Sequence, residues 1–360
     1  MRTSRAALAG ILVLASIVGG CAAVSHISGI RPPSEAAYQK SHPLQVQFVR
    51  RSAPRRQLGV GVDFYTYPGQ NVAADAAKTV AYVKSLHANA LSVSFPYFMR
   101  GQHSSVVFAT NETPTPADLA ILAGTAEKAG LYVSLRPLLD ETSLGTSRTG
   151  WKPARIAAWF ASYRKFLIPY AEMAEQTRIP EFMDGAEFSK FGHSHRWDRL
   201  VTALRKVYRG TITYDNNWGI PLTGNGGRGV LEGVDSYAPM PVPANASVAR
   251  LTAAWAAYDG TLPPGTVQLE VDIAAVRGAY ARPFQVSQWH ETRLVPSVQV
   301  RWFTAACRAL VTANLGGIYF WGIGLGQSTM TPPGLANPGA WVDSAGARAI
   351  SACFKKLARR

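Results

Sequence analysis

Two glutamates stand out because each lies in a short apolar run that predicts a buried strand. Glu187 ends EFMDGAE at 181–187, and Glu270 lies within TVQLEVD at 266–272. A carboxylate in an apolar strand is costly to bury unless it is paired or protonated. Two such groups can catalyse a displacement reaction together: one protonates the leaving oxygen, and the other attacks the electrophilic carbon. For either glutamate alone, a structural ion pair is the alternative interpretation.

Carboxylates, amides and aromatic rings dominate the ends of the other predicted strands. The residues at or just after these strand ends are Asp63, Tyr65, Pro96, Tyr97, Arg136, Asp140, Glu141, Asn216, Asn217, Trp218, Tyr237, Asp272 and Trp321. The sequence shows no nucleophile elbow, HExxH motif or phosphate-binding loop. Paired carboxylates, with rings that pack on the apolar face of a sugar, are what glycoside hydrolysis requires. This pattern predicts a polysaccharide or oligosaccharide substrate.

We expect no metal and no organic cofactor. His193 and His195 alternate in the loop sequence GHSH but lack a third well-placed ligand. Two carboxylates suffice for glycoside hydrolysis, so the predicted chemistry needs no added group.

Strands and helices alternate along the chain from residue 58 onward. The predicted strands span 58–65, 88–95, 131–137, 181–187, 211–217, 233–239, 266–272 and 316–322. The predicted helices span 72–87, 116–129, 153–177, 195–208, 247–259, 296–313 and 344–357. Eight strands, mostly followed by helices, predict an α/β fold, a single-domain (β/α)8 TIM barrel, with the strand-end residues gathered at one mouth.

Two features of the pattern depart from a regular barrel or favour another fold. The helix expected after the fifth strand is missing, and a Gly-rich stretch at 223–229 replaces it, which we interpret as a plain loop. An open doubly wound sheet is the structural competitor. Its glycine fingerprint should follow the first strand, but YTYPG at 65–69 does not supply it.

The beginning of the chain predicts export. Arg2 and Arg5 precede an apolar run at 7–18, and VGGC at 18–21 resembles a bacterial lipobox in which Cys21 is acylated. We predict a signal peptide over 1–20, a tether over 21–57 and the barrel over 58–360. The predicted product is a lipoprotein anchored to the cell membrane in the cell envelope. An ordinary secretory signal cleaved at the same small residues is the alternative.

The chain is basic, with a formal net charge of +15. Residues 1–20 contain two arginines and no acid, so the mature chain would carry +13. The densest basic run, RRSAPRR at 50–56, falls in the predicted tether, where anionic head groups would attract it. Because the chain is predicted to be exported and no aromatic–basic motif accompanies the charge, we expect no nucleic-acid partner. We expect a monomer.

Two cysteines remain after Cys21. Cys307 and Cys353 fall on the last two predicted helices. An exported chain can keep a disulfide, so one bridge could join these helices. Two buried thiols are the equal alternative, because spacing alone does not give the separation that a bridge needs.

The stretch 131–187 resembles glycoside hydrolase family 113, the β-mannanase-type family of the retaining (β/α)8 clan. The resemblance rests on LYVSLRPLLDE, on the helix sequence from GWKPAR to YAEMAEQ, and on FMDGAEF. It continues through YDNNW, LEVDIAAVRGAYARPF and YFWGIG, and covers about residues 58–325.

The resemblance implies roles for particular residues. Glu187 would be the acid/base, Glu270 the nucleophile, Tyr237 the hydrogen-bond partner of the nucleophile, and Trp321 the floor beside the cleaved sugar. Substrate-lining roles would fall to Tyr65, Arg136, Asp140, Asn217, Trp218 and Asp272.

Two positions depart from the family pattern. Ala186 stands where a polar residue precedes the acid/base, and Asp272 replaces a small residue two positions after the nucleophile. A second carboxylate near Glu270 would raise the pKa of one of the pair. The departures leave open a changed sugar specificity, or a non-catalytic carbohydrate-binding protein on a degenerate barrel.

Overall fold

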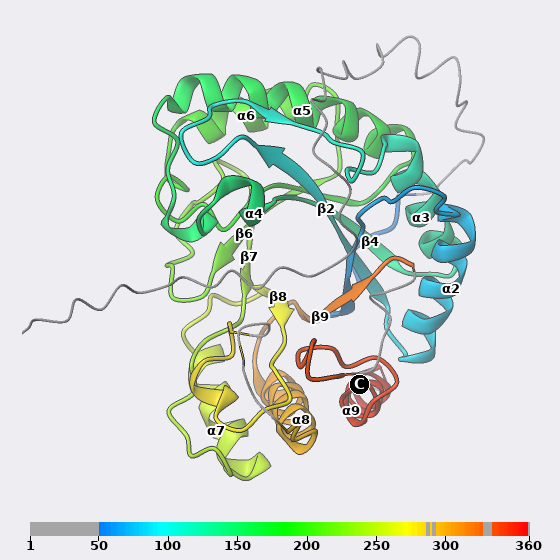
Figure 1. Ribbon diagram of the computed structural model, residues 1–360, viewed down its shortest axis with the longest axis vertical. Coiled ribbons are helices and arrows are strands. Elements are labelled where there is room, and N and C mark those ends of the chain that lie inside the picture. The colour runs from blue at the N-terminus through cyan, green and yellow to red at the C-terminus, as the bar shows by residue number, and fades with distance from the viewer. Residues whose placement is uncertain (1–49, 286–288, 290–292, 327–332, 359–360) are drawn as a thin grey trace, which may run out of the picture.

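The computed structural model describes residues 50–285, 289, 293–326 and 333–358, which form a closed parallel barrel (Figure 1). Its strands are β1 (Gln57–Asp63), β2 (Ala90–Met99), β4 (Tyr132–Leu139), β5 (Glu181–Ala186), β6 (Thr211–Asn217), β7 (Leu231–Asp235), β8 (Val267–Val271) and β9 (Gly317–Gly324). They pair in parallel in this order, and β9 pairs with β1 to close the ring. The predicted (β/α)8 barrel is confirmed. We call the carboxyl ends of the strands the mouth and their amino ends the base.

The predicted helices surround this barrel. They are α2 (Val72–Ser85), α3 (Pro116–Lys128), α5 (Ile156–Gln176), α6 (Arg196–Leu204), α7 (Val248–Asp259), α8 (Ser297–Thr312) and α9 (Ala345–Leu357). Residues 218–230, between β6 and β7, contain no helix, as the Gly-rich stretch predicts. None of these described helices is long and apolar enough to cross a bilayer.

Four short elements near the mouth were not predicted. They are β3 (Val107–Phe108), which pairs antiparallel with β2, the helix α4 (Glu141–Leu144), and the 3-10 helices η1 (Arg148–Gly150) and η2 (Ala279–Ala281). Elements this short leave no hydrophobic period in a sequence, which explains why the pattern did not reveal them.

Local capping explains where several helices begin. At α3, the Thr115 hydroxyl accepts from the Asp118 N–H, and the Asp118 carboxylate accepts from the Thr115 N–H. This capping box satisfies backbone donors that the first turn leaves free. Asn71 at α2 and Ser344 at α9 do the same with one side chain each.

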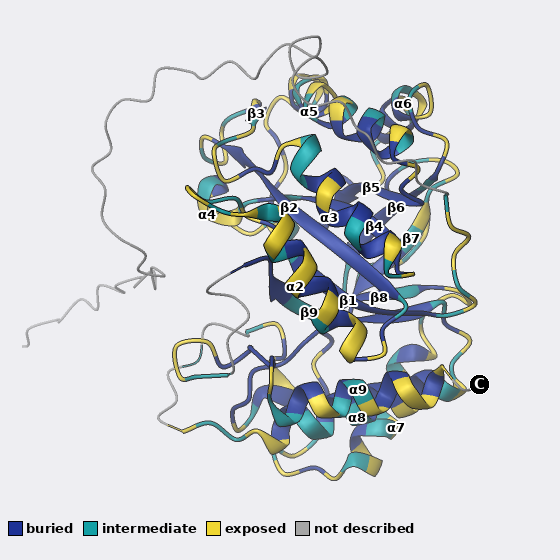
Figure 2. Ribbon diagram, turned by 90° about the vertical axis from the view of Figure 1, so that its right-hand side faces the viewer, coloured by how far each residue is buried: buried dark blue, intermediate teal, exposed yellow. Residues whose placement is uncertain are grey.

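Apolar side chains fill the space on both sides of the strands. Figure 2 shows buried strands at the centre and helices with exposed outer faces. The main core lies between strands and helices, and a smaller cluster that includes Tyr132, Met183 and Tyr319 forms a second core. Trp159 and Phe160 of α5 are buried, as their helical spacing predicts, and pack edge-to-face against Trp197 of α6.

Cys307 of α8 and Cys353 of α9 form a disulfide with a Cα–Cα separation of 5.8 Å. Of the two alternatives that the sequence leaves open, the structure therefore has the bridge. It joins neighbouring helices, 46 residues apart in the chain, on the outside of β8, β9 and β1.

Replacing both cysteines by serine should lower the free energy of unfolding by about 2–4 kcal/mol, because the bridge restricts the unfolded chain. Urea unfolding of the oxidised protein and of the double variant measures the difference. Reductant should destabilise the unaltered chain to a similar extent and leave the double variant unchanged. Equal midpoints for the oxidised protein and the variant would contradict a stabilising bridge.

Candidate functional site

Arg136 of β4 is the centre of a buried charge cluster at the mouth. Its guanidinium donates to Asp215 of β6, to Asp235 of β7 and to Glu270 of β8. The Nε–Oδ2 distance to Asp215 is 2.7 Å, and the distance from the guanidinium to Asp235 Oδ2 is 2.8 Å. The Arg136 side chain has no exposed surface. One cation therefore ties together four strands across the barrel interior.

Several carboxyl groups in and near this cluster have raised pKa values. Burial, and then the charges of Glu270 and Glu187, raise the pKa of Asp215 to about 7 although Arg136 opposes the shift. Burial and the neighbouring Asp215 raise the pKa of Asp235 further. Burial and Glu270 also raise the pKa of Asp63, at the end of β1, to about 7.

Two groups hold Glu270 by hydrogen bonds. Arg136 donates to its Oε1, and the Tyr237 hydroxyl is hydrogen-bonded to it. Trp321 of β9 packs on Arg136, with the Cζ atom 4.9 Å from the ring centroid. Gly61 of β1 makes room for this ring, because a Cβ there would lie 1.9 Å from it. The Trp321–Gly322 peptide bond is cis.

Glu187 follows directly after β5 and has a backbone φ of 59°. Residues other than glycine adopt this region rarely, and it recurs at functional sites. The Glu187 N–H donates to the Asp215 carbonyl at 2.8 Å, and the next N–H, of Phe188, donates to the Tyr214 hydroxyl. Gly185 permits close packing of Trp197 and Tyr214 just before the turn. The aromatic packing therefore turns the Glu187 side chain toward the mouth.

A second arginine holds Glu187. Arg148 of η1 donates to Glu187 Oε2 at 2.6 Å, and Asn217 of β6 donates to Oε1 at 2.6 Å. Arg148 also donates to the Leu139 carbonyl at 2.7 Å, which holds the guanidinium in place. Burial would raise the pKa of Glu187, but the charges of Arg148 and Arg136 and these hydrogen bonds outweigh it and lower the pKa.

The two glutamates belong to one site. Both affect the pKa of Asp215 and of Asp235 through their charges, and Arg136 acts on both in turn. Each is largely buried, with 8% of the residue surface exposed. The mouth thus presents two carboxylates from different strands, each held by its own arginine.

The other predicted site residues lie around this pair in different ways. Asn217 contacts Glu187 directly. Trp218 stacks on Phe284 with centroids 5.9 Å apart, and the two rings make a partly exposed aromatic surface beside Asn217. Tyr65 is 38% exposed, and the charges of Asp63, Asp140 and Arg148 act on it.

Arg136, Asp140 and Asp272 are the remaining predicted substrate-lining residues, and each has neighbours within the protein. Arg136 is fully buried beneath Trp321, so it holds Glu270 rather than lining the cleft. Asp140 caps α4 by accepting from the Ser143 N–H at 2.6 Å. Asp272 is buried, and burial followed by the charge of Glu270 raises its pKa well above the ordinary range.

Sequence reasoning missed Arg148, Asp235, Asp215 and Phe284. Asp215 has a detectable signal, because Thr213, Asp215 and Asn217 alternate along β6 and face the same side. Arg148 lies in an irregular connection whose path depends on the packing of α4 and η1, and no spacing rule points to it.

His193 and His195 lie on the exposed loop before α6. Within the described part of the chain, no three His, Cys, Asp or Glu side chains are grouped so that they could hold a metal ion. At the mouth, the Arg136 guanidinium fills the centre of the carboxylate cluster.

Residues 62–322 match the model of Glycoside Hydrolase Family 113. The chain belongs to glycoside hydrolase family 113. It is a glycoside hydrolase and acts on a carbohydrate substrate.

Solved structures share the fold of this family 113 hydrolase. A GH113 β-1,4-mannanase matches with a TM-score of 0.67 at 18% identity over 84% of this chain and 99% of the other. The GH113 β-mannanase of Alicyclobacillus acidocaldarius, in complex with ManMIm, matches with a TM-score of 0.68 at 17% identity over 87% and 99%. A GH5_18 protein from Streptomyces cattleya, in complex with GlcNAc, matches at 0.54 and 12% over 85% and 81%. A search of curated protein sequences finds no match.

In the family 113 hydrolase, Arg148→Gln should raise the pKa of Glu187, because it removes the nearest positive charge and a charged hydrogen bond while burial remains. The 13C resonance of the Glu187 carboxyl, identified by its loss in Glu187→Gln, reports the titration. Arg250→Gln, at the exposed start of α7, is the matched control and should leave the titration unchanged. An unchanged or lower pKa in Arg148→Gln would show that Arg148 does not set the protonation of Glu187.

Proposed function

We propose that this chain is an exported, lipid-anchored retaining glycoside hydrolase in which Glu270 is the nucleophile and Glu187 the acid/base. The observation that supports it is the pair of arginine-held glutamates at one mouth, Arg136 with Glu270 and Arg148 with Glu187. We also propose that it acts as a monomer.

The reaction would proceed by two displacements. Glu270 attacks the anomeric carbon while Glu187 transfers its proton to the glycosidic oxygen, so that the C–O bond breaks and the alcohol leaves. Water then attacks the glycosyl ester, Glu187 accepts the proton of the water, and the Glu270 carboxylate is released. Arg136 and Tyr237 keep the Glu270 carboxyl group in position during both steps.

The contact between Arg148 and Glu187 has a consequence for this cycle. Glu187 must carry a proton in the first step, yet Arg148 favours its ionised form. The protonated fraction falls as the pH rises above the lowered pKa, so glycosylation should favour acidic conditions. Binding of the leaving-group sugar beside Glu187 would separate the two side chains and raise the pKa toward the value that an acid catalyst needs.

The substrate class is proposed from the relatives and from the aromatic surfaces. The structural neighbours include a GH113 β-1,4-mannanase and a GH113 β-mannanase. Mannans with β-1,4 linkages are therefore the first substrates to test. Trp321 would form the floor beside the cleaved sugar, and Trp218 with Phe284 offers a second stacking surface. Ala186 is buried and carries no polar group, so the usual contact with the sugar 2-hydroxyl must be replaced or absent.

The proposed anchoring rests on the sequence alone. Cys21 and the preceding apolar run lie outside the described residues. The arrangement of an arginine pair, an apolar run and VGGC supports acylation at Cys21 in the cell envelope.

Azide can distinguish the roles of the two glutamates. With an activated aryl β-mannoside, Glu270→Ala should lose turnover, and azide should restore it by attacking the vacated face, giving a glycosyl azide of inverted configuration. Glu187→Ala should lose about 10²–10⁴-fold on an unactivated glycoside and less on the activated one. With Glu187→Ala, azide should give a glycosyl azide of retained configuration. NMR of the products identifies each anomer.

Asp272→Asn is the control, because it removes a neighbouring buried carboxyl group that has no covalent role in this mechanism. Azide should not increase its turnover. The same azide product from both glutamate variants, or full activity of Glu270→Ala, would refute the assignment.

Acylation of Cys21 should be visible by metabolic labelling with an alkyne fatty acid in a bacterial host. The unaltered chain should incorporate the label and sediment with membranes, whereas Cys21→Ser should do neither. Cys307→Ser is the control, because its sulfur lies on α8 in a disulfide. Release of an unlabelled mature chain into the medium would indicate an ordinary secretory signal instead.

A further inference from the structure

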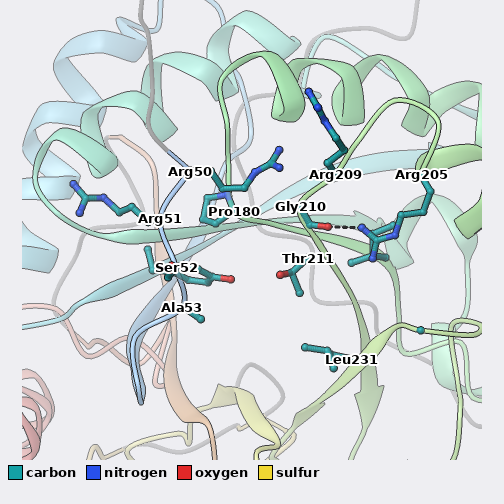
Figure 3. Close-up of a pocket in the computed structure, with 13 residues that line it drawn as sticks. Arg50, Arg51, Ser52, Ala53, Pro180, Arg205, Arg209, Gly210, Thr211 and Leu231 are labelled. Carbon is teal, nitrogen blue, oxygen red and sulfur yellow. Dashed lines mark hydrogen bonds between the residues drawn. The ribbon is translucent and has the colours of Figure 1, made fainter.

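A recess of about 420 Å³ lies at the base of the barrel, at the opposite end from the glutamates. Figure 3 shows residues 50–53 along one wall and, along the other, Arg205, Arg209 and Gly210, which follow α6, and Thr211, which begins β6. Tyr132, Pro180 and Leu231, near the amino ends of β4, β5 and β7, complete the lining. This volume is in the range of ligand-binding clefts.

Four arginines line the recess, and none of its described lining residues is acidic: Arg50, Arg51, Arg205 and Arg209. Arg50 and Arg209 share the carboxylate of Glu175 at 2.5 and 2.8 Å. Burial opposes the ionisation of Glu175, but hydrogen bonds from both arginines lower its pKa to about 2. The negative charge of Glu175 therefore neutralises only one of the two positive charges of Arg50 and Arg209.

Within the described part of the chain, the remaining two arginines form no ion pair within 4.0 Å. Arg51 donates to the Glu127 carbonyl at 2.8 Å, and Arg205 donates to the Gly210 carbonyl. A guanidinium has five N–H donors, so these single contacts leave donors for a further acceptor. Guanidinium groups match phosphate oxygens in geometry as well as in charge.

Helix termini explain only part of this charge. Arg205 and Arg209 follow α6, where cations are favourable at the negative end of the helix dipole. Arg50 and Arg51 come from a different segment that belongs to no helix. Their contacts with Glu175 and with the Glu127 carbonyl place them opposite Arg205 and Arg209.

Further basic side chains lie at the base of the barrel. Lysines occupy the last turns of helices that end there: Lys84, Lys128, Lys355 and Lys356. An anionic surface would attract these side chains together with the arginines of the recess.

We propose that the arginine-lined recess binds the phosphate groups of anionic phospholipids and seats the base of the barrel on the membrane, with the catalytic mouth directed away from it. The recess wall itself, residues 50–53, continues upstream in the sequence toward Cys21. Lipid contact and the proposed anchor thus lie at the same end of the molecule. The inference does not depend on the roles of Glu187 and Glu270.

Vesicle binding of the full chain tests this inference. Vesicles of phosphatidylcholine alone are compared with vesicles in which one lipid in three is phosphatidylglycerol. Arg205→Gln combined with Arg209→Gln should weaken binding to the anionic vesicles about 25-fold, because each basic residue near such a surface contributes about fivefold. Binding to the neutral vesicles should not change, since both proteins keep the same N-terminal segment.

Matched controls separate the recess from net charge and from folding. Arg100→Gln combined with Arg250→Gln removes two charges near the mouth and should leave anionic binding within about twofold of the unaltered chain, because the surface field decays within a Debye length. Arg205→Lys combined with Arg209→Lys keeps the charge and should retain most of the binding. Thermal unfolding of each variant shows whether the barrel remains intact.

Several outcomes would overturn the proposal. Equal losses in the recess and mouth variants would indicate net charge alone, and equal losses in the Gln and Lys variants would indicate a structural role for the arginines. Saturable binding of inorganic phosphate that the Gln variant abolishes, without preference for anionic vesicles, would assign the recess to a soluble phosphate compound instead of a lipid.

Discussion

The mouth of this barrel depends on one buried cation. Arg136 has no contact with solvent, and its guanidinium binds three carboxylates from three other strands. A charge pair in a protein interior loses hydration that only well-placed partners repay, and removing one partner of such a pair costs about 3–5 kcal/mol. The relative positions of β4, β6, β7 and β8 at the mouth are therefore fixed by the same contacts that fix Glu270. Raised pKa values at Asp215 and Asp235 allow protons to reduce the excess of negative charge.

Arg136 and Arg148, which hold the two glutamates, lie in different kinds of structure. Arg136 lies on a strand inside the barrel under Trp321, where neighbouring strands fix it. Arg148 lies in a connection at the rim, and its guanidinium is held by the Leu139 carbonyl and by Glu187 itself. In the proposed mechanism, the strand-borne arginine would hold the nucleophile in place, and the rim-borne arginine would act on the group whose protonation changes.

Carboxylates gather around Arg136 at the carboxyl ends of the strands, and four arginines line a recess at the amino ends. A (β/α)8 barrel allows different surfaces at its two ends because strand order fixes both ends, while the connections at each end vary independently. In the proposed membrane-bound arrangement, the recess would face the lipid and the mouth would face away from it.

The sequence alone determined the barrel, since eight strand patterns alternate with seven helix patterns and the short Gly-rich stretch marks the missing helix. It also determined which strand ends carry Glu187 and Glu270, because side-chain direction along a strand follows from counting residues. It did not determine Arg148, the stack of Trp218 on Phe284, or the disulfide between α8 and α9. These contacts join segments whose separation depends on how loops and helices pack, and no local period encodes that separation. The burial that turns Arg136 from a cleft residue into a hidden support is likewise a property of the closed barrel, because a neighbouring ring on β9 covers it.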